Sequence, residues 1–140
     1  ELGKDITISG KLDKIEFLDS AGGVSVVDYK TGKPKSRNEI EGKTKNSDGA
    51  LIRQLVFYDL LLEKYKNGKY RMKQGVIDFV EPNERGIYKR ETFEVKEKDK
   101  KELVELIKKS ADEILRLKFW DTRCSDKTCK YCRLRNLLIR

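Results

Sequence analysis

The fold is decided by residues 5–30, which read DITISGKLDKIEFLDSAGGVSVVDYK. Residues 5–18 are rich in β-branched side chains and alternate in part between apolar and polar, which is typical of a strand. The alternation changes phase near Asp13, so we expect either a bulge there or a strand that is covered on both faces. Residues 19–23 (DSAGG) indicate a turn and residues 24–30 (VSVVDYK) a second strand. The two strands are expected to pair as an antiparallel hairpin.

Two carboxylates are expected to face each other across this hairpin. Folding the chain about the centre of its turn puts Asp13 opposite Asp28, and residues opposed in this way have Cβ atoms roughly 4.5–5.5 Å apart. Asp28 follows three valines in an apolar strand, where a solvated aspartate is not expected. Carboxylates this close repel each other unless a cation joins them, and Mg²⁺ prefers such oxygen ligands. The pattern therefore indicates a candidate metal site.

A lysine is expected on the same side of the strand. Lys30 follows Asp28 by two residues, so both side chains lie on one strand face. An ammonium group beside a metal can orient water or neutralise charge that builds on a phosphate. The alternative is an ordinary hairpin with surface charges, because 40% of the residues are charged and a D-x-K triplet is expected by chance in such a chain.

Beyond the hairpin, the sequence predicts one long loop, two helices and two further strands. The first helix is apolar nearly all round and is expected to be buried, whereas the second has an apolar stripe on one face. In chain order these elements are a loop over 32–49, a helix over 50–66, a strand over 74–81, a strand over 87–95 and a helix over 98–118. The order β-β-α-β-β-α predicts an α/β fold with a mixed central sheet flanked by helices.

The chain is basic, with a net charge of +8 and no histidine. A basic surface favours a polyanion such as nucleic acid, although lysine-rich surfaces also serve solubility. Between Lys118 and Arg140 there are seven Lys or Arg against two Asp, so more than half of the net charge lies in this tail. The candidate contacts to DNA phosphates are Lys33, Lys35, Arg37, Arg133 and Arg135.

The length of 140 residues predicts a single domain, residues 1–140, with residues 119–140 as a basic, cysteine-containing tail. Because the chain starts at Glu1 rather than at Met, we expect it to be a piece of a larger protein. No apolar run approaches the ~20 residues of a membrane helix, and no secretory signal is visible. We therefore expect a cytoplasmic protein without a membrane partner.

Three cysteines, Cys124, Cys129 and Cys132, lie close together in the tail. An odd, clustered set is a poor disulfide framework and suits a reducing compartment. One interpretation is a zinc site with a fourth ligand from elsewhere. The other, which we favour, is a clasp of reduced thiols without a metal.

Three segments together resemble the PD-(D/E)xK nucleases. They are Gly10–Glu16 (GKLDKIE), Val26–Lys33 (VVDYKTGK) and Arg53–Tyr58 (RQLVFY), and they occur in the family's order. Within that superfamily the chain is similar to the RecB-type domain found at the C-terminus of UvrD/Rep-like DNA helicases. The resemblance implies a restriction-endonuclease-like fold.

The resemblance also implies the catalytic residues, which are Asp13, Asp28, Lys30, Gln54 and Tyr58. The two aspartates would bind the metal with help from the backbone carbonyl of Tyr29, and the lysine would assist the attacking water. Gln54 and Tyr58 lie four residues apart and therefore on one helix face. They are implied to hold the region of the lysine and the DNA, although core packing is an alternative role for Tyr58.

The implied activity is hydrolysis of DNA phosphodiester bonds with Mg²⁺ or Mn²⁺. The substrate would be single-stranded DNA, fed by a helicase domain of the same chain during DNA repair or recombination. One alternative is a catalytically degenerate DNA-binding or coupling module of a helicase. Another is a small interaction domain that a metal staples together at the cysteines.

The chain departs from the family pattern in two places. The family has a His or Glu ligand on a helix upstream of the first strand, but here only Glu1 and Asp5 precede the motif. Many relatives end with C-x2-C-x5-C, which holds an iron–sulfur cluster together with an upstream cysteine. Here Leu138 takes the place of the last cysteine. Three thiolates do not complete a four-cysteine cluster, so no iron–sulfur cluster is expected in this chain.

Overall fold

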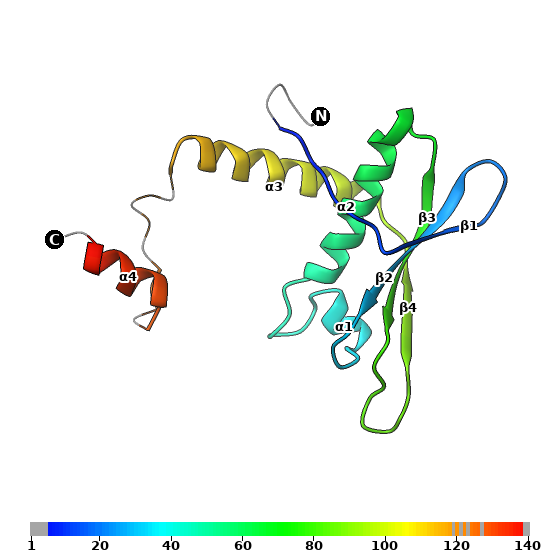
Figure 1. The fold of residues 1–140 in the computed structure, drawn as a ribbon, viewed down its shortest axis with the longest axis horizontal. Helices are drawn as coiled ribbons and strands as arrows, with labels where there is room; N and C mark the ends of the chain where they lie inside the picture. Colours follow the sequence, from blue (N-terminus) through cyan, green and yellow to red (C-terminus); the bar gives the residue numbers. More distant parts are fainter. Residues whose placement is uncertain (1–5, 119, 121, 123, 127, 139–140) are drawn as a thin grey trace. The chain divides into compact units, whose positions relative to one another are not determined.

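Four strands form one mixed sheet within residues 6–118, 120, 122, 124–126 and 128–138, which the computed structural model describes (Figure 1). The strands are β1 (Lys14–Phe17), β2 (Gly23–Lys30), β3 (Arg71–Phe79) and β4 (Lys89–Phe93), and they lie side by side in that order. β2 is antiparallel to β1 and parallel to β3, and β3 is antiparallel to β4. Because β2 and β3 are parallel, their carboxyl ends lie at the same edge of the sheet.

The helices are α1 (Arg37–Ile40), α2 (Ala50–Lys64), α3 (Glu97–Leu115) and α4 (Lys130–Leu138), with a 3₁₀ turn, η1 (Tyr65–Asn67), directly after α2. The chain forms two compact units, residues 1–106 and 107–140. The first unit holds the sheet, α1, α2 and the beginning of α3, and the second holds the rest of α3 and α4. The expected α/β fold with a mixed sheet and helices is confirmed. None of the described helices has the length and apolar character that crossing a bilayer requires.

The expectation of a strand over 5–18 is wrong for its first part, because β1 begins only at Lys14. Asp5 lies outside the described residues. Before β1 the chain runs along α2, where a Cβ added to Gly10 would come within 2.8 Å of a methyl carbon of Leu61. Leu12 of this segment packs against the core without belonging to a regular strand. The partial alternation before Lys14 therefore does not mark a strand.

The predicted register of the hairpin is confirmed. Lys14 pairs with Val27, so extending the same register by one residue sets Asp13 opposite Asp28. The strand starts directly after Asp13, and the paired residues of β1 contain no bulge.

The predicted loop over 32–49 is wrong in part, because it contains α1. A capping box starts this helix: the Ser36 hydroxyl accepts from the Glu39 N–H, and the Glu39 carboxylate accepts from the Ser36 N–H. Ile40 is fully buried and ties the short helix to the core. The S-x-x-E pattern is a readable sequence signal for such a start.

The remaining predicted elements are confirmed with shifted ends. α2 ends at Lys64 instead of 66, β3 covers 71–79 instead of 74–81, β4 covers 89–93 instead of 87–95, and α3 covers 97–115 instead of 98–118. β3 begins early because its polar first residues pair with the start of β2, where Arg71 lies opposite Gly23. α4 lies in the tail, where no helix was predicted.

The core lies between the sheet and α2. Val24 and Ile77 are fully buried and pack with Leu55 of α2. Burial of each such side chain contributes roughly 1.5–3 kcal/mol. Gly75 on β3 allows the helix to come close, since a Cβ there would lie 2.9 Å from a methyl carbon of Leu55.

The opposite face of the sheet carries an ion-pair network. Arg90 of β4 lies 3.3 Å from Asp78 of the neighbouring strand β3 and 3.3 Å from Glu16 of β1. Its side chain therefore links the two edge strands of the sheet. Val27 and Val76, which alternate with residues of the core face, are buried on this side.

A buried lysine joins the beginning of α3 to α2. Lys100 is 7% exposed, and its ammonium lies 3.4 Å from Asp59 and pairs with Glu63 and Glu97 as well. Burial alone would lower the pKa of Lys100, but hydrogen bonds to Glu63 and Glu97 outweigh it and raise the pKa above its ordinary value. Burial also raises the pKa of Asp59. One cation thus holds three carboxylates together.

Lys100→Ala is expected to lower the free energy of unfolding by about 3 kcal/mol, because removing one partner of a buried ion pair leaves the other charge uncompensated. Lys98→Ala is the matched control, since the pair of Lys98 with Glu102 is well exposed and contributes at most about 1 kcal/mol. Urea denaturation followed by circular dichroism measures both variants. Equal, small losses would contradict a structural role for Lys100.

Candidate active site

One hydrogen-bonded cluster joins β2 to α2. Asp28 is only 2% exposed, and its Oδ1 accepts hydrogen bonds from the Tyr58 hydroxyl at 2.8 Å and from Nε2 of Gln54 at 2.9 Å. Nζ of Lys30 donates to Oε1 of Gln54 at 2.7 Å. Asp28 and Lys30 lie on one face of β2 because side chains alternate along a strand, and Gln54 and Tyr58 lie on one face of α2 because they are one turn apart. These two faces are turned toward each other. The structure thus brings together four of the predicted site residues.

The hydrogen bonding of this cluster is incomplete at the second carboxylate oxygen of Asp28. Oδ2 is buried and has no hydrogen-bond partner among the described residues. Nζ of Lys30 lies 2.6 Å away, which makes an ion pair but not a hydrogen bond of good geometry. Only charge attraction therefore compensates the burial of this oxygen.

Asp13 lies at the exposed side of the cluster. Its Oδ2 accepts a hydrogen bond from the backbone N–H of Tyr29 at 3.0 Å. This bond holds the side chain beside the strand that carries Asp28, opposite which Asp13 lies in the hairpin register. The two carboxylates therefore come to one edge of the sheet from β2 and from the residue directly before β1.

The phenol of Tyr58 is kept neutral by its surroundings. Burial, the hydrogen bond to Asp28 and the nearby charge of Asp13 raise the pKa of Tyr58 to about 12. The hydroxyl is therefore a hydrogen-bond donor to Asp28 over the physiological pH range.

The charged groups at this edge fit a hard divalent cation. Asp13 and Asp28 offer carboxylate oxygens, which Mg²⁺ and Mn²⁺ prefer over nitrogen or sulfur ligands. With Lys30 counted, the three side chains carry one net negative charge. The buried Oδ2 of Asp28, which has no hydrogen-bond partner in the part of the chain that the structure describes, is the atom that a cation would satisfy.

Among the basic residues predicted to contact DNA, Arg37 has a clear structural role. Its guanidinium lies 4.3 Å from the centre of the Phe93 ring and 2.9 Å from Glu91. It also pairs with Glu41 at 3.2 Å. Arg37 therefore fastens α1 to β4.

The other predicted DNA contacts lie in both units. Lys33 and Lys35 are exposed residues of the segment after β2, and Lys33 lies 3.5 Å from Glu84. Arg133 and Arg135 lie on α4 in the second unit, where Arg135 donates to the carbonyl of Thr122 at 3.3 Å. Lys33 and Lys35 therefore belong to the first unit, and Arg133 and Arg135 belong to the second.

The three cysteines converge within the second unit. The sulfur atoms of Cys124, Cys129 and Cys132 all lie within 4.8 Å of one another, and those of Cys124 and Cys132 are 3.3 Å apart. A hydrogen bond from the backbone of Cys132, followed by one from the Cys124 thiol, lowers the pKa of Cys129 to about 7. This geometry supplies three of the four ligands of a tetrahedral zinc site and is equally compatible with a clasp of reduced thiols.

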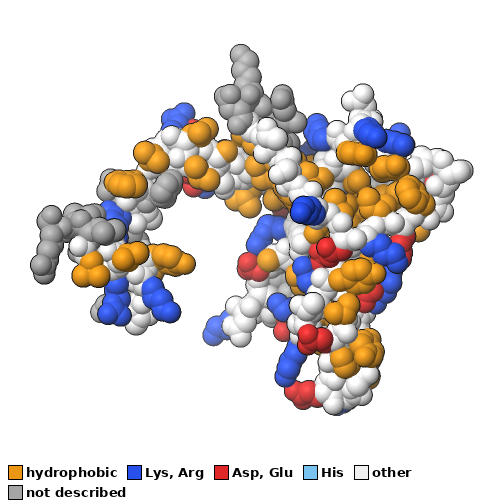
Figure 2. Space-filling model, in the orientation of Figure 1, with side chains coloured by type: hydrophobic (Ala, Val, Ile, Leu, Met, Phe, Trp, Pro, Cys, Tyr) orange, Lys and Arg blue, Asp and Glu red, His pale blue; other side chains and the backbone are white. Residues whose placement is uncertain are grey.

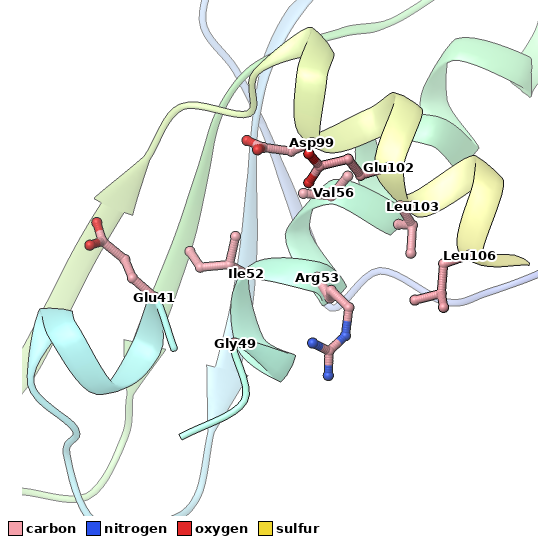
Figure 3. A pocket seen from close by; sticks show the side chains of 9 residues that line it. All are labelled: Glu41, Gly49, Ile52, Arg53, Val56, Asp99, Glu102, Leu103 and Leu106. Carbon is pink, nitrogen blue, oxygen red and sulfur yellow. The ribbon is translucent and has the colours of Figure 1, made fainter. Parts of the chain in front are cut away.

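A hollow of about 300 Å³ lies between α2 and the beginning of α3 (Figure 3). Its apolar lining includes Ile52, Val56, Leu103 and Leu106. None of the residues of the hydrogen-bonded cluster lines it. The hollow is therefore not part of the candidate active site.

Two features of the site go beyond the sequence-based expectations. Gln54 and Tyr58 were expected on one helix face, but their direct bonds to Asp28 were not predicted. The available signal was a pair of polar residues one turn apart in an otherwise apolar helix. The hairpin over 80–88, which follows β3 at the same sheet edge, was not singled out either.

The sequence matches the family model of the PD-(D/E)XK nuclease superfamily over residues 1–137. A comparison with curated proteins found no match. The family match covers nearly the whole chain and agrees with the mixed four-stranded sheet flanked by helices. The expected restriction-endonuclease-like α/β fold is thereby confirmed.

Tyr58→Phe is expected to remove an ionisation phase centred near pH 12 from the ultraviolet titration of the folded protein, because Tyr58 has a pKa of about 12. Since an ordinary tyrosine has a pKa of about 10, the contribution of this group to the free energy of unfolding is complete below pH ~10 and is lost as the pH rises toward pH ~12. Tyr88→Phe is the control. Persistence of the late phase in Tyr58→Phe would assign it to another residue.

Proposed function

The chain belongs to the PD-(D/E)XK nuclease superfamily, and we propose that it is a Mg²⁺- or Mn²⁺-dependent deoxyribonuclease domain. The observation that carries this proposal is Oδ2 of Asp28, a buried carboxylate oxygen to which no described residue donates a hydrogen bond and which lies across the hairpin from Asp13. Asp13 brings a second carboxylate to this cluster, and two carboxylates set opposite each other favour a cation between them. The cluster therefore favours a metal-dependent reaction.

Asp13 and Asp28 would hold the cation together with the backbone carbonyl of Tyr29. When bound, such a cation activates water and neutralises charge on the phosphate. Asp28 is pre-oriented for this task, because its other oxygen is fixed by Tyr58 and Gln54. Binding would not require the carboxylate to reorganise.

Lys30 is proposed to act on the phosphate or on the attacking water. With a metal ion held by Asp13 and Asp28, Lys30 would no longer be needed to neutralise Asp28 and could turn its charge toward the substrate. In the structure Nζ of Lys30 is held by Oε1 of Gln54 at 2.7 Å. Gln54 is thus a positioning residue for Lys30, and Tyr58 is a positioning residue for Asp28.

We propose DNA as the substrate, in single-stranded form, delivered by a helicase domain of the same protein during repair or recombination in the cytoplasm. The net charge of +8 supports a polyanionic partner. The exposed Lys33, Lys35 and Arg133 are suited to phosphate contacts, which carry no sequence information. The resemblance to RecB-type domains supports the helicase context.

A second candidate is a catalytically degenerate DNA-binding or coupling module. The ion pair between Lys30 and Asp28 favours it, because the ammonium at 2.6 Å already neutralises the buried carboxylate without a metal. The two candidates differ in whether a divalent cation displaces this lysine.

Asp28→Asn is expected to weaken Mn²⁺ binding and cleavage of labelled single-stranded DNA by about a hundredfold, since even outer-shell partners of metal ligands change affinity or activity by about 10–100-fold. Calorimetry measures the binding, and gel electrophoresis of the DNA measures cleavage. Asp78→Asn is the matched control, because Asp78 lies on the neighbouring strand and pairs with Arg90 on the opposite face of the sheet.

Equal Mn²⁺ binding by the wild type and Asp28→Asn would show that the metal site is wrong. A wild-type protein that binds both Mn²⁺ and DNA but does not cleave would favour the degenerate module. Loss of folding in Asp28→Asn is checked by circular dichroism.

A further inference from the structure

The hairpin between β3 and β4, residues 80–88, projects from the sheet edge at which the candidate active site lies (Figure 1). In the parallel pair of β2 and β3, Lys30 lies opposite Phe79, the last residue of β3. The N–H of Val80 then donates to the carbonyl of Lys30 at 3.0 Å. The base of the hairpin is therefore bonded to the backbone of the candidate active-site lysine.

Hydrogen bonds around one asparagine order the tip of this hairpin. Oδ1 of Asn83 accepts from the N–H groups of Arg85 and Ile87 at 2.9 and 3.0 Å. The backbone of Asn83 bonds to Ile87 and to Gly86, each at 2.9 Å. Gly86 adopts φ 75°, a conformation that favours glycine. A hairpin ordered in this way loses little conformational freedom when a ligand binds.

The ordered hairpin presents apolar surface to solvent. Ile87 is 57% exposed and Tyr88 is 66% exposed. Figure 2 shows apolar side chains at the surface of the hairpin, at the lower end of the view, with basic and acidic side chains beside them. Exposed aromatic and aliphatic side chains on an ordered turn next to an active site are suited to contact with a ligand.

Basic groups lie next to Ile87 of this apolar surface. Lys33 and Arg85 line an open hollow of about 370 Å³ together with Pro34, Asn83, Glu84 and Ile87. Lys33 lies 3.5 Å from Glu84, and both side chains are more than 80% exposed. An ion pair this exposed is weak. Lys33 can therefore exchange Glu84 for a phosphate with little loss.

We propose that this surface, formed by Lys33, Arg85, Ile87 and Tyr88, binds an unpaired DNA strand and leads it to the candidate active site. Lys33 and Arg85 contact phosphates, and Tyr88 and Ile87 lie against bases. An unpaired strand exposes the faces of its bases, whereas a duplex buries them in its stack, and stacking on an aromatic ring tolerates any base. The inference rests on the proposed nuclease function and adds the surface that would hold the unpaired strand beside the site.

The test is fluorescence anisotropy of the full chain with a labelled single-stranded oligothymidylate and with a labelled duplex of equal length, in the presence of EDTA so that no cleavage occurs. Tyr88→Ala is expected to weaken single-strand binding about tenfold and duplex binding less than twofold. Tyr88→Phe should bind as the wild type does, since the ring is retained. Arg85→Ala should lower the slope of affinity against salt by about 0.7 for a single strand. Phe17→Ala, which removes an equally exposed ring from β1, is the control.

The proposal is overturned if Tyr88→Ala binds the single strand normally, or if it weakens both DNA forms equally. An unchanged DNA affinity in all hairpin variants would overturn it as well. Because the assay contains no divalent cation, a protein that shows the expected binding pattern but no Mn²⁺-dependent cleavage would refute the nuclease function alone. Thermal unfolding of each variant checks that the fold is retained.

Discussion

Burying the carboxylate of Asp28 at 2% exposure would cost several kcal/mol without compensation, and the structure around it supplies that compensation. Tyr58 and Gln54 donate to one oxygen, and Lys30 neutralises the other. These donors lie on α2 and on β2 itself, so α2 must pack close enough to the strand for its side chains to reach. Gly75 permits this approach by leaving room for the packed helix. The position of α2 on the sheet and the geometry of the site therefore depend on the same interaction.

The same cluster explains how a site can be ordered before its cation arrives. One oxygen of Asp28 is fixed by two neutral donors, and among the described residues the other faces only the ammonium of Lys30. In the proposed function this second oxygen would help to hold the metal ion, and Gln54 would keep the lysine close to the reaction. Asp13, directly before β1, is held by its bond to the backbone N–H of Tyr29. The hairpin over 80–88 extends this edge with an ordered surface that is bonded to the same strand.

The hairpin register and the four side chains of the cluster could be predicted from the sequence. The two-residue period of a strand and the 3.6-residue period of a helix determine which residues share a face. The actual bonds from α2 to Asp28 could not be predicted, since they depend on how closely the helix packs on the strand. The strand predicted before Lys14 is wrong because the chain there runs along α2, where Gly10 comes close to Leu61. α1 was missed although its S-x-x-E capping box was visible. The convergence of the three cysteine sulfur atoms depends on the local path of the tail, which spacing alone does not determine.

In the proposed function, Asp13 and Asp28 would bind one divalent cation, and Lys30 would leave the buried carboxylate. Anomalous diffraction from a crystal of the protein soaked in Mn²⁺, with a metal-free crystal for comparison, tests both points. We expect an anomalous peak within about 2.5 Å of oxygens from both carboxylates, with Nζ of Lys30 moved away from Oδ2 of Asp28. A peak at the cysteines alone, or a lysine that remains on Asp28 at saturating Mn²⁺, would contradict it.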